Sequence, residues 1–184
     1  MSASPLGTLS RSSSHAVAER GVPPYVHDAA LLLLRLALGL TMASHGAQKL
    51  FGWFSGVGLD GAGRVFTSAG YPAGKAMAVM AGLSEVLGGV GLALGLLTSL
   101  AGAAVVGVMV NAVALKWGGG FFAPSGVEYE LIIAALAVVL AVVGPGRYAL
   151  DRHLPGVRAH RAGHGVAAVV LGVVLGVIVL MFRG

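Results

Sequence analysis

The 184-residue sequence contains no cysteine. This absence excludes disulfide bonds, thiolate nucleophiles, cysteine-ligated iron–sulfur clusters and haem attached through a C-x-x-C-H motif. Charge is also scarce: Asp, Glu, Lys and Arg make up 10% of the chain, whereas an ordinary soluble domain is about 25% charged. So little charge is not typical of the surface of a water-soluble domain.

Apolar residues and glycine take the place of charge. Apolar residues make up 57% of the chain, and its mean hydropathy is +0.88. The 30 glycines suit helices that pack closely in lipid. The net charge of +5 does not indicate nucleic-acid binding, because most of the positive charge lies between apolar stretches. The composition predicts an all-α fold, a polytopic membrane helix bundle in contact with the lipid bilayer.

Five apolar stretches are predicted to span the membrane, where a helix needs about 20 residues to cross the hydrocarbon. The first begins at Ala29 and continues toward residue 54. Residues 77–115 are too long for one crossing, so they are predicted to form two spans joined by a turn near residues 96–100. The fourth span covers 127–143 and ends at a Gly-Pro-Gly sequence, because proline cannot continue a helix. The fifth covers 165–182 and contains no ionisable residue.

The segments outside the spans give the domain organisation and the orientation. Residues 1–28 are predicted to be a flexible tail, 153–164 a basic loop, and 165–184 an additional C-terminal transmembrane helix. Short cytoplasmic loops are enriched in Lys and Arg. The segment between the fourth and fifth spans contains Arg147, Arg152, Arg158 and Arg161. We therefore expect a multi-pass protein of the cell (cytoplasmic or inner) membrane, with a cytoplasmic N-terminus and the C-terminus outside.

Three polar residues are predicted to lie deep within the spans: Arg35, Glu85 and Asn111. A single charge at the centre of a bilayer costs about 2.5–3.5 kcal/mol on insertion scales. An ion pair between Arg35 and Glu85 on adjacent antiparallel helices would offset that cost for both residues. The sequence leaves three interpretations open. Arg35 reaches the headgroups while Glu85 is protonated, the pair serves packing alone, or the three residues form a functional polar site.

A second polar group lies at the predicted outer ends of the spans. His45 and Lys49 are four residues apart and share one helix face, Lys116 ends the third span, and Glu128 and Glu130 begin the fourth. These five residues are candidates for contacting a ligand or a partner, while Lys116 and Glu128 taken singly also fit ordinary interface residues. His45 titrates near neutrality and could transfer a proton. Because His45 and Lys49 can be hydrated at the interface, we expect neither to be needed for folding. The group offers too few ligands for a metal, so no metal site is predicted.

Three segments, in this order, resemble the DoxX-like family of small membrane proteins: RLALGLTMASHGAQKLF, GLSEVLGGVGLALGLLT and GPGRYALD. The resemblance covers roughly residues 29–152 and implies a four-helix membrane domain. The family-like positions are Arg35, His45, Gly46, Lys49, Glu85, Gly88, Gly89 and Asp151. The chain departs from the family pattern in its long tail and fifth apolar span, so the expected architecture is a four-helix DoxX-like core plus a fifth C-terminal transmembrane helix.

The resemblance also implies association with membrane redox systems, because some relatives are small subunits of thiosulfate:quinone oxidoreductases and others anchor complexes that include superoxide dismutase. One hypothesis is therefore a non-catalytic or quinone-contacting subunit of a membrane oxidoreductase, with redox-enzyme partner subunits that carry the electrons. No covalently bound cofactor is expected, and a quinone is the candidate ligand. The alternatives are a small proton-linked transporter and a pure membrane assembly scaffold. Small-xxx-small glycine spacing, as in Gly91–Gly95 and Gly172–Gly176, is compatible with close helix packing or a homo-oligomer.

Overall fold

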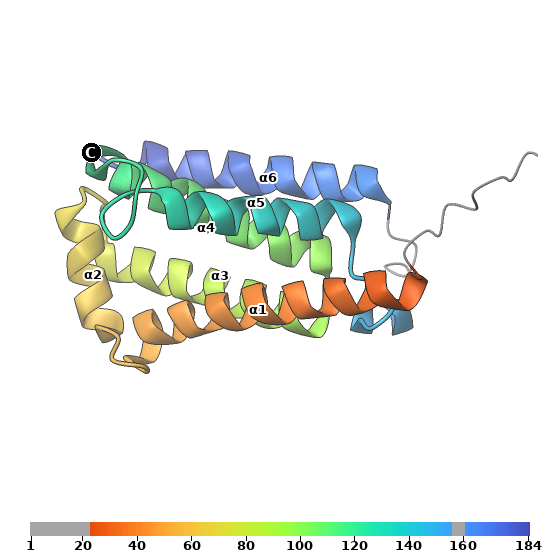
Figure 1. Ribbon diagram of the computed structural model, residues 1–184. Helices are drawn as coiled ribbons and strands as arrows, with labels where there is room; N and C mark the ends of the chain where they lie inside the picture. The colour runs from red at the N-terminus through yellow and green to blue at the C-terminus, as the bar shows by residue number, and fades with distance from the viewer. Residues whose placement is uncertain (1–22, 156–160) are drawn as a thin grey trace, which may run out of the picture.

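The computed structural model describes residues 23–155 and 161–184, and every regular element in these ranges is a helix. The helices are α1 (Pro24–Phe51), α2 (Gly58–Ser68), α3 (Gly74–Leu94), α4 (Thr98–Lys116), α5 (Glu128–Val143) and α6 (Ala162–Met181), with two short 3-10 segments, η1 (Trp117–Gly119) and η2 (Leu150–His153) (Figure 1). The predicted all-α helix bundle is confirmed.

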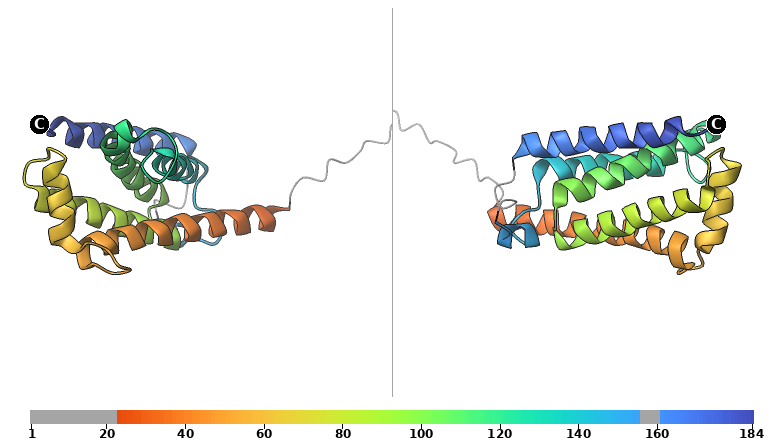
Figure 2. Two further views of the ribbon diagram at one scale, coloured as in Figure 1. Left: turned by 60° about the vertical axis from the view of Figure 1, so that its left-hand side comes forward. Right: turned by 180° about the vertical axis from the view of Figure 1, so that it is seen from behind.

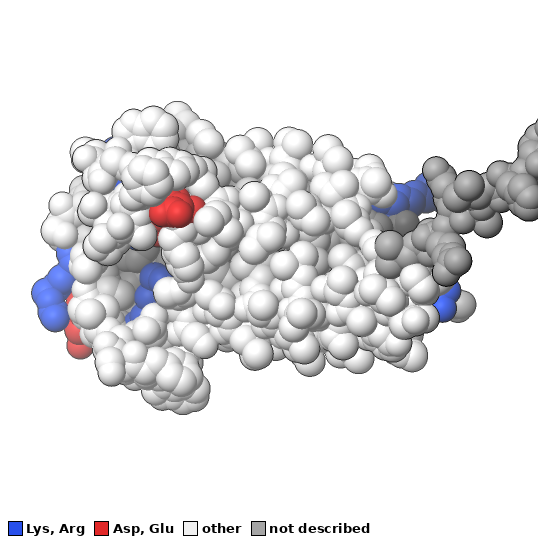
Figure 3. All heavy atoms as spheres, in the orientation of Figure 1, with Lys and Arg blue, Asp and Glu red and all other residues white. Residues whose placement is uncertain are grey.

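Five long helices run along the bundle in alternating directions, and the short helix α2 lies across one end (Figure 1). We call the end at which α1 begins the proximal end and the end that carries α2 the distal end. The chain terminates at the distal end, so the first described residue and the C-terminus lie at opposite ends. On the face drawn in Figure 3, charged side chains gather toward the two ends and leave an uncharged middle.

Four described helical segments are long and apolar enough to cross a membrane: α1, α3, α4 together with η1, and α6. The predicted fourth span forms α5, which has 16 residues and is thus shorter than the roughly 20 that a crossing needs. It is nevertheless strongly apolar after its first turn and packs against both α4 and α6. The protein is a multi-pass membrane protein whose lateral surface contacts the bilayer.

Helix α1 begins five residues earlier than predicted. Pro24 occupies the first turn, where its missing N–H would have had no helical partner. Residues 24–28 are therefore helical rather than part of a flexible tail, while the preceding residues 1–22 lie outside the described ranges. Asp28 is buried, accepts a hydrogen bond from the backbone N–H of Arg147 at 2.8 Å, and pairs with its guanidinium at 3.3 Å.

Glycines bring α1 and α3 into backbone contact. A Cβ added at Gly89 would collide with the backbone of Ala43 and with the Gly39 carbonyl, and one at Gly46 would meet the Gly82 carbonyl at 2.6 Å. The same device joins α6 to α4, because a Cβ at Gly172 would strike the Ala103 carbonyl. Close backbone contacts at these glycines thus set the register and spacing of the helices that carry the polar residues.

Candidate functional site

Arg35 lies at the proximal end of α3, far from Glu85. The guanidinium is buried, with 1% of the residue exposed, and it donates hydrogen bonds to the carbonyl oxygens of Pro145 and Tyr148 at 2.5 Å each. Its Nε has no hydrogen-bond partner among the described residues. The predicted Arg35–Glu85 ion pair is therefore wrong, because the segment after α5 supplies the acceptors for Arg35.

The register of α1 against α3 explains the error. Gly39 faces Gly89 where the two helices cross, so Arg35 lies beside Gly95, which ends α3. Glu85 is ten residues before Gly95, about 15 Å along the helix at 1.5 Å per residue. The relative register of two apolar helices is set by such backbone contacts.

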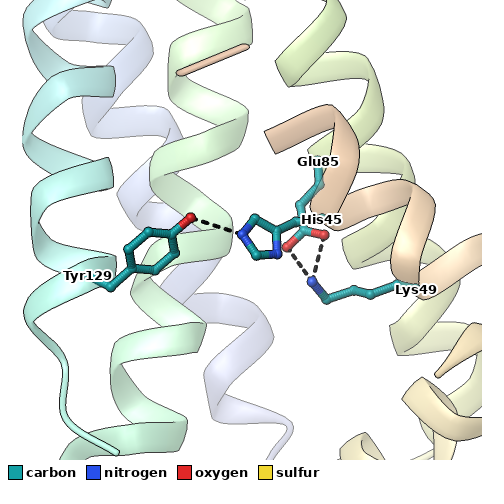
Figure 4. Close-up of polar contacts among 4 residues, drawn as sticks. All are labelled: His45, Lys49, Glu85 and Tyr129. Carbon is teal, nitrogen blue, oxygen red and sulfur yellow. Dashed lines mark hydrogen bonds and ion pairs between the residues drawn. The ribbon is translucent and has the colours of Figure 1, made fainter. Parts of the chain in front are cut away.

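Glu85 pairs instead with Lys49. The Lys49 ammonium lies 2.8 Å from Oε1 and 2.7 Å from Oε2 of the Glu85 carboxylate, so it donates to both oxygens (Figure 4). Glu85 is 3% exposed and Lys49 29%. Lys49 was expected to be a hydrated residue independent of folding, and this contact makes it the counter-charge of a buried acid.

His45 connects α1 to α5. Its Nε2 lies 2.9 Å from the hydroxyl oxygen of Tyr129, and the two rings meet edge to face with centroids 5.8 Å apart. Figure 4 shows the imidazole between Tyr129 on one side and the Lys49–Glu85 pair on the other. Tyr129 was missed from the sequence, although its place between two glutamates at the start of a span was a usable signal.

Two of the three remaining distal candidates, Lys116 and Glu130, form a second ion pair. The Lys116 ammonium lies 2.6 Å from Oε1 of Glu130, a residue that is 7% exposed in its side chain. Its other oxygen, Oε2, is buried with no hydrogen-bond partner among the described residues. Glu128 lies apart and accepts a long hydrogen bond from the backbone N–H of Ala123 at 3.3 Å. The structure thus brings four of the five predicted distal residues into two ion pairs and one histidine–tyrosine contact.

Asn111 serves helix packing rather than a network with Arg35 and Glu85. Its side-chain nitrogen donates to the carbonyl oxygens of Gly107 at 3.2 Å and Gly176 at 2.8 Å, which ties α4 to α6. Its oxygen accepts from the Tyr71 hydroxyl at 2.8 Å. The amide is therefore satisfied on both sides, and the predicted three-residue polar network does not form.

The family-like positions at Gly46, Gly88, Gly89 and Asp151 are structural. Gly46 and Gly89 lie at the contact of α1 with α3, and a Cβ at Gly88 would meet the Ala101 carbonyl of α4 at 3.1 Å. Asp151 in η2 accepts hydrogen bonds from the backbone of the α3–α4 turn. These residues position the helices that carry Lys49 and Glu85.

A cavity of about 490 Å³ lies beside the Lys49–Glu85 pair. Its volume falls within the 300–1,000 Å³ that is usual for small-molecule sites, which combine apolar walls with a few polar groups. Apolar residues of α3, α4 and α6 form most of its walls, and Lys49, Ser84, Glu85 and Asn111 supply the polar groups. Such a cavity can hold an amphipathic molecule with its polar part at the ion pair. Among the described residues, no cluster of three or more His, Asp or Glu side chains could hold a metal ion.

In the comparison with known families, the model of the family described as DoxX matches residues 30–123. These residues cover most of α1 and all of α2 to α4, and hence both Lys49 and Glu85. They leave out α5 and α6. No curated protein and no solved structure matches the chain.

Proposed function

The chain belongs to the DoxX family, and from that premise we propose that it is a quinone-contacting, non-catalytic subunit of a membrane-associated oxidoreductase system. Residues of the protein hold the quinone, and a partner subunit carries the electrons. The association of DoxX-like proteins with membrane redox systems supports this assignment, and so does the ion pair in the wall of an apolar cavity.

The observation that carries the proposal is the Lys49–Glu85 pair beside the cavity. Lys49 is a hydrogen-bond donor and Glu85 an acceptor, so the pair can donate to the carbonyl oxygen of a quinone and accept from the hydroxyl of a quinol. Hydrogen bonds to charged groups are about twice as strong as those between neutral groups. When bound, the quinone supplies the two-electron chemistry.

His45 and Tyr129 support the same role, because the imidazole lies between the Lys49–Glu85 pair and the Tyr129 ring in the first turn of α5 (Figure 4). Tyr129 is 41% exposed and contacts His45. Histidine exchanges protons near neutral pH, so His45 is placed to move protons between the ion pair and the exterior. This requires the distal end to face outside, the orientation expected from the arginines between α5 and α6.

The test begins with gentle detergent purification of the full chain from its native membrane, identification of copurifying proteins, and an optical spectrum. A redox subunit with an absorbing cofactor is the expected partner. The double variant Lys49→Gln with Glu85→Gln should then lower quinone reduction by the complex while preserving copurification.

The matched control is Lys75→Gln with Asp60→Asn, which removes an ion pair of 2.7 Å in which both side chains are exposed. This variant should behave as wild type. Copurification without a redox partner, or full quinone reduction by the Lys49–Glu85 double variant, would contradict the proposal.

A proton-linked transporter is the second candidate, favoured by the burial of Glu85 within a helix that can span the membrane. The transporter hypothesis makes a different prediction. Purified protein in liposomes would then take up solute only under a proton gradient, and the Glu85→Gln change would abolish uptake without any partner protein being present. A scaffold would show neither property and would retain its partners in both double variants.

A further inference from the structure

We propose that the groove over α4, between α3 and α6, binds the prenyl chain of the quinone, with its ring at Lys49 and Glu85. This inference rests on the proposed function, and it adds the site of the chain and the class of quinone, namely one with a long isoprenoid tail. It also gives α6 a role in recognition.

The groove follows from how three helices pack. Helix α4 contacts both α3 and α6, and seen from behind it lies between them (Figure 2). Residues that line the cavity on α4 run from Leu100 to Leu115, a length of about 22 Å at 1.5 Å per residue. The floor is therefore long enough for an extended chain that runs along the bundle, parallel to the lipid chains.

The groove opens sideways toward the hydrocarbon. Several of its lining residues are large apolar side chains that are between 42% and 52% exposed: Met80, Leu100, Leu171, Leu175 and Ile178. A molecule dissolved in the bilayer can thus reach the groove without passing through water. Since lipid chains are as apolar as these side chains, selectivity for one chain has to come from shape rather than from hydrophobicity.

The ion pair in the wall of the groove selects a neutral headgroup. The positive charge of Lys49 is already matched by the Glu85 carboxylate, which it contacts through both oxygens. An anionic lipid headgroup placed there would be repelled by Glu85, whereas an uncharged ring with carbonyl or hydroxyl oxygens meets a donor and an acceptor. Charge complementarity therefore favours a quinone over an anionic phospholipid.

Helix α6 completes the groove and lies outside the residues that match the DoxX family. Its backbone is held against α4 by Gly172 and Gly176, whose Cβ positions would collide with the carbonyls of Ala103 and Gly107. This close approach directs Leu171 and Leu175 along the groove as a wall. The tail site is thus a feature that this chain adds to the family core.

The test uses photolabelling in nanodiscs, with an azido-quinone that carries a prenyl tail and the same azido-quinone without a tail. Labelled peptides are identified by mass spectrometry, so the readout does not depend on enzymatic activity. The tailed probe should label peptides of α3, α4 and α6 and be displaced by unlabelled prenylquinone but not by excess phosphatidylglycerol. Displacement by phosphatidylglycerol would show a lipid site instead and overturn the inference.

Two variants fill the groove: Ala104→Phe on α4 and, should that variant fail to fold, Ala81→Phe on α3, both at lining residues. Labelling by the tailed probe should fall about tenfold, a change of 1.4 kcal/mol, because the phenyl ring occupies the place of the chain. The matched control is Ala135→Phe, at an exposed position of α5 that does not line the groove.

The tailless probe separates the two proposals. Labelling by it should be unchanged in the groove-filling variants and lost in the Lys49→Gln, Glu85→Gln double variant. If the double variant loses both probes while the groove-filling variants label normally, the quinone binds at the ion pair but its tail lies elsewhere. If neither probe labels near Lys49 in the unmodified protein, the proposed function itself fails.

Discussion

Asp151 caps the helix that begins at Thr98, 53 residues earlier in the chain. Its Oδ2 accepts hydrogen bonds from the backbone N–H of Thr98 at 3.0 Å and from the Thr98 hydroxyl at 2.8 Å, while Oδ1 accepts from the N–H of Leu97 at 2.6 Å. The first N–H groups of a helix have no partner within it. The Asp151 carboxylate in η2 therefore accepts hydrogen bonds from the N–H groups at the start of α4. It also attaches the segment after α5 to the α3–α4 turn.

The first prediction concerns this cap. Asp151→Ala should lower the free energy of unfolding by about 2 kcal/mol, the upper part of the range for a lost helix cap, because a buried threonine hydroxyl also loses its partner. Thermal unfolding in detergent measures the change. Asp60→Asn, at an exposed ion pair, is the control and should leave the melting temperature unchanged. Equal melting temperatures for Asp151→Ala and wild type would refute the capping role.

A second prediction follows from the separation of the Lys49–Glu85 pair from Arg35. Lys49→Gln should cost about 3 kcal/mol, the low end of the range for a broken buried pair, because Lys49 is partly exposed. Adding Glu85→Gln should recover part of that loss, so the double-mutant cycle is non-additive. The cycle of Arg35→Gln with Glu85→Gln should be additive. Chemical unfolding of the purified variants measures all of these, and coupling in the second cycle would contradict the observed separation.

His45 provides the third prediction. His45→Asn should leave folded yield and melting temperature close to wild type, because the imidazole makes one partly exposed contact to Tyr129. The same change should slow quinone-linked turnover of the complex and remove the contribution of the imidazole from its pH profile. Tyr129→Phe removes only the hydroxyl and serves as the comparison. An unchanged pH profile in His45→Asn would exclude His45 from proton transfer.

The fourth prediction uses two glycines of α6. Gly172→Ala should sharply reduce the folded yield, because its Cβ would overlap the backbone carbonyl of Ala103 in α4. Gly163→Ala on the same helix meets nothing within 4 Å and should be neutral or slightly stabilising, since alanine favours helix more than glycine does. Yield of monodisperse protein after detergent extraction is the measurement. Equal yields would show that α6 does not depend on this close approach.

The fifth prediction concerns orientation. Four arginines between α5 and α6 predict a cytoplasmic proximal end by the positive-inside rule. A periplasm-active reporter fused after Gly184 should therefore be active, and a cytoplasm-active reporter at the same position inactive. The reverse pattern would move the Lys49–Glu85 site to the cytoplasmic side.

Hydropathy was sufficient to predict the long helices of the bundle, because each apolar stretch has one way to satisfy its backbone in lipid. The turn between α3 and α4 was also predicted, and it forms at residues 95–97. Helix α2 was missed. Its sequence, GLDGAGRVFTS, is short and glycine-rich, but Leu59, Ala62 and Phe66 recur at helical spacing and were a readable signal.

The pairing of charges was harder to predict than the helices. Lys49 and Glu85 were both selected from the sequence, yet Glu85 was assigned to Arg35, because depth along a span does not determine the register of one helix against another. Backbone contacts at glycines set the true register, and a sequence pattern that marks a glycine as small does not say which glycine it faces. The position of Tyr129 between two glutamates was a signal for the residue itself, but not for its partner His45, which lies on a different helix.

The position of the Arg35 acceptors late in the chain has a consequence for folding during synthesis. They lie 110 and 113 residues later in the chain, so at translation rates of about 5–20 residues per second Arg35 exists for roughly 5–20 s before they are made. Glu85 follows Lys49 by 36 residues, a wait of about 2–7 s at the same rates. The Lys49–Glu85 pair can therefore close while the ribosome is still producing α4. Arg35 has to remain near the aqueous edge of the nascent bundle until the segment after α5 emerges. Truncation before residue 145 therefore leaves the Arg35 guanidinium without its two carbonyl acceptors.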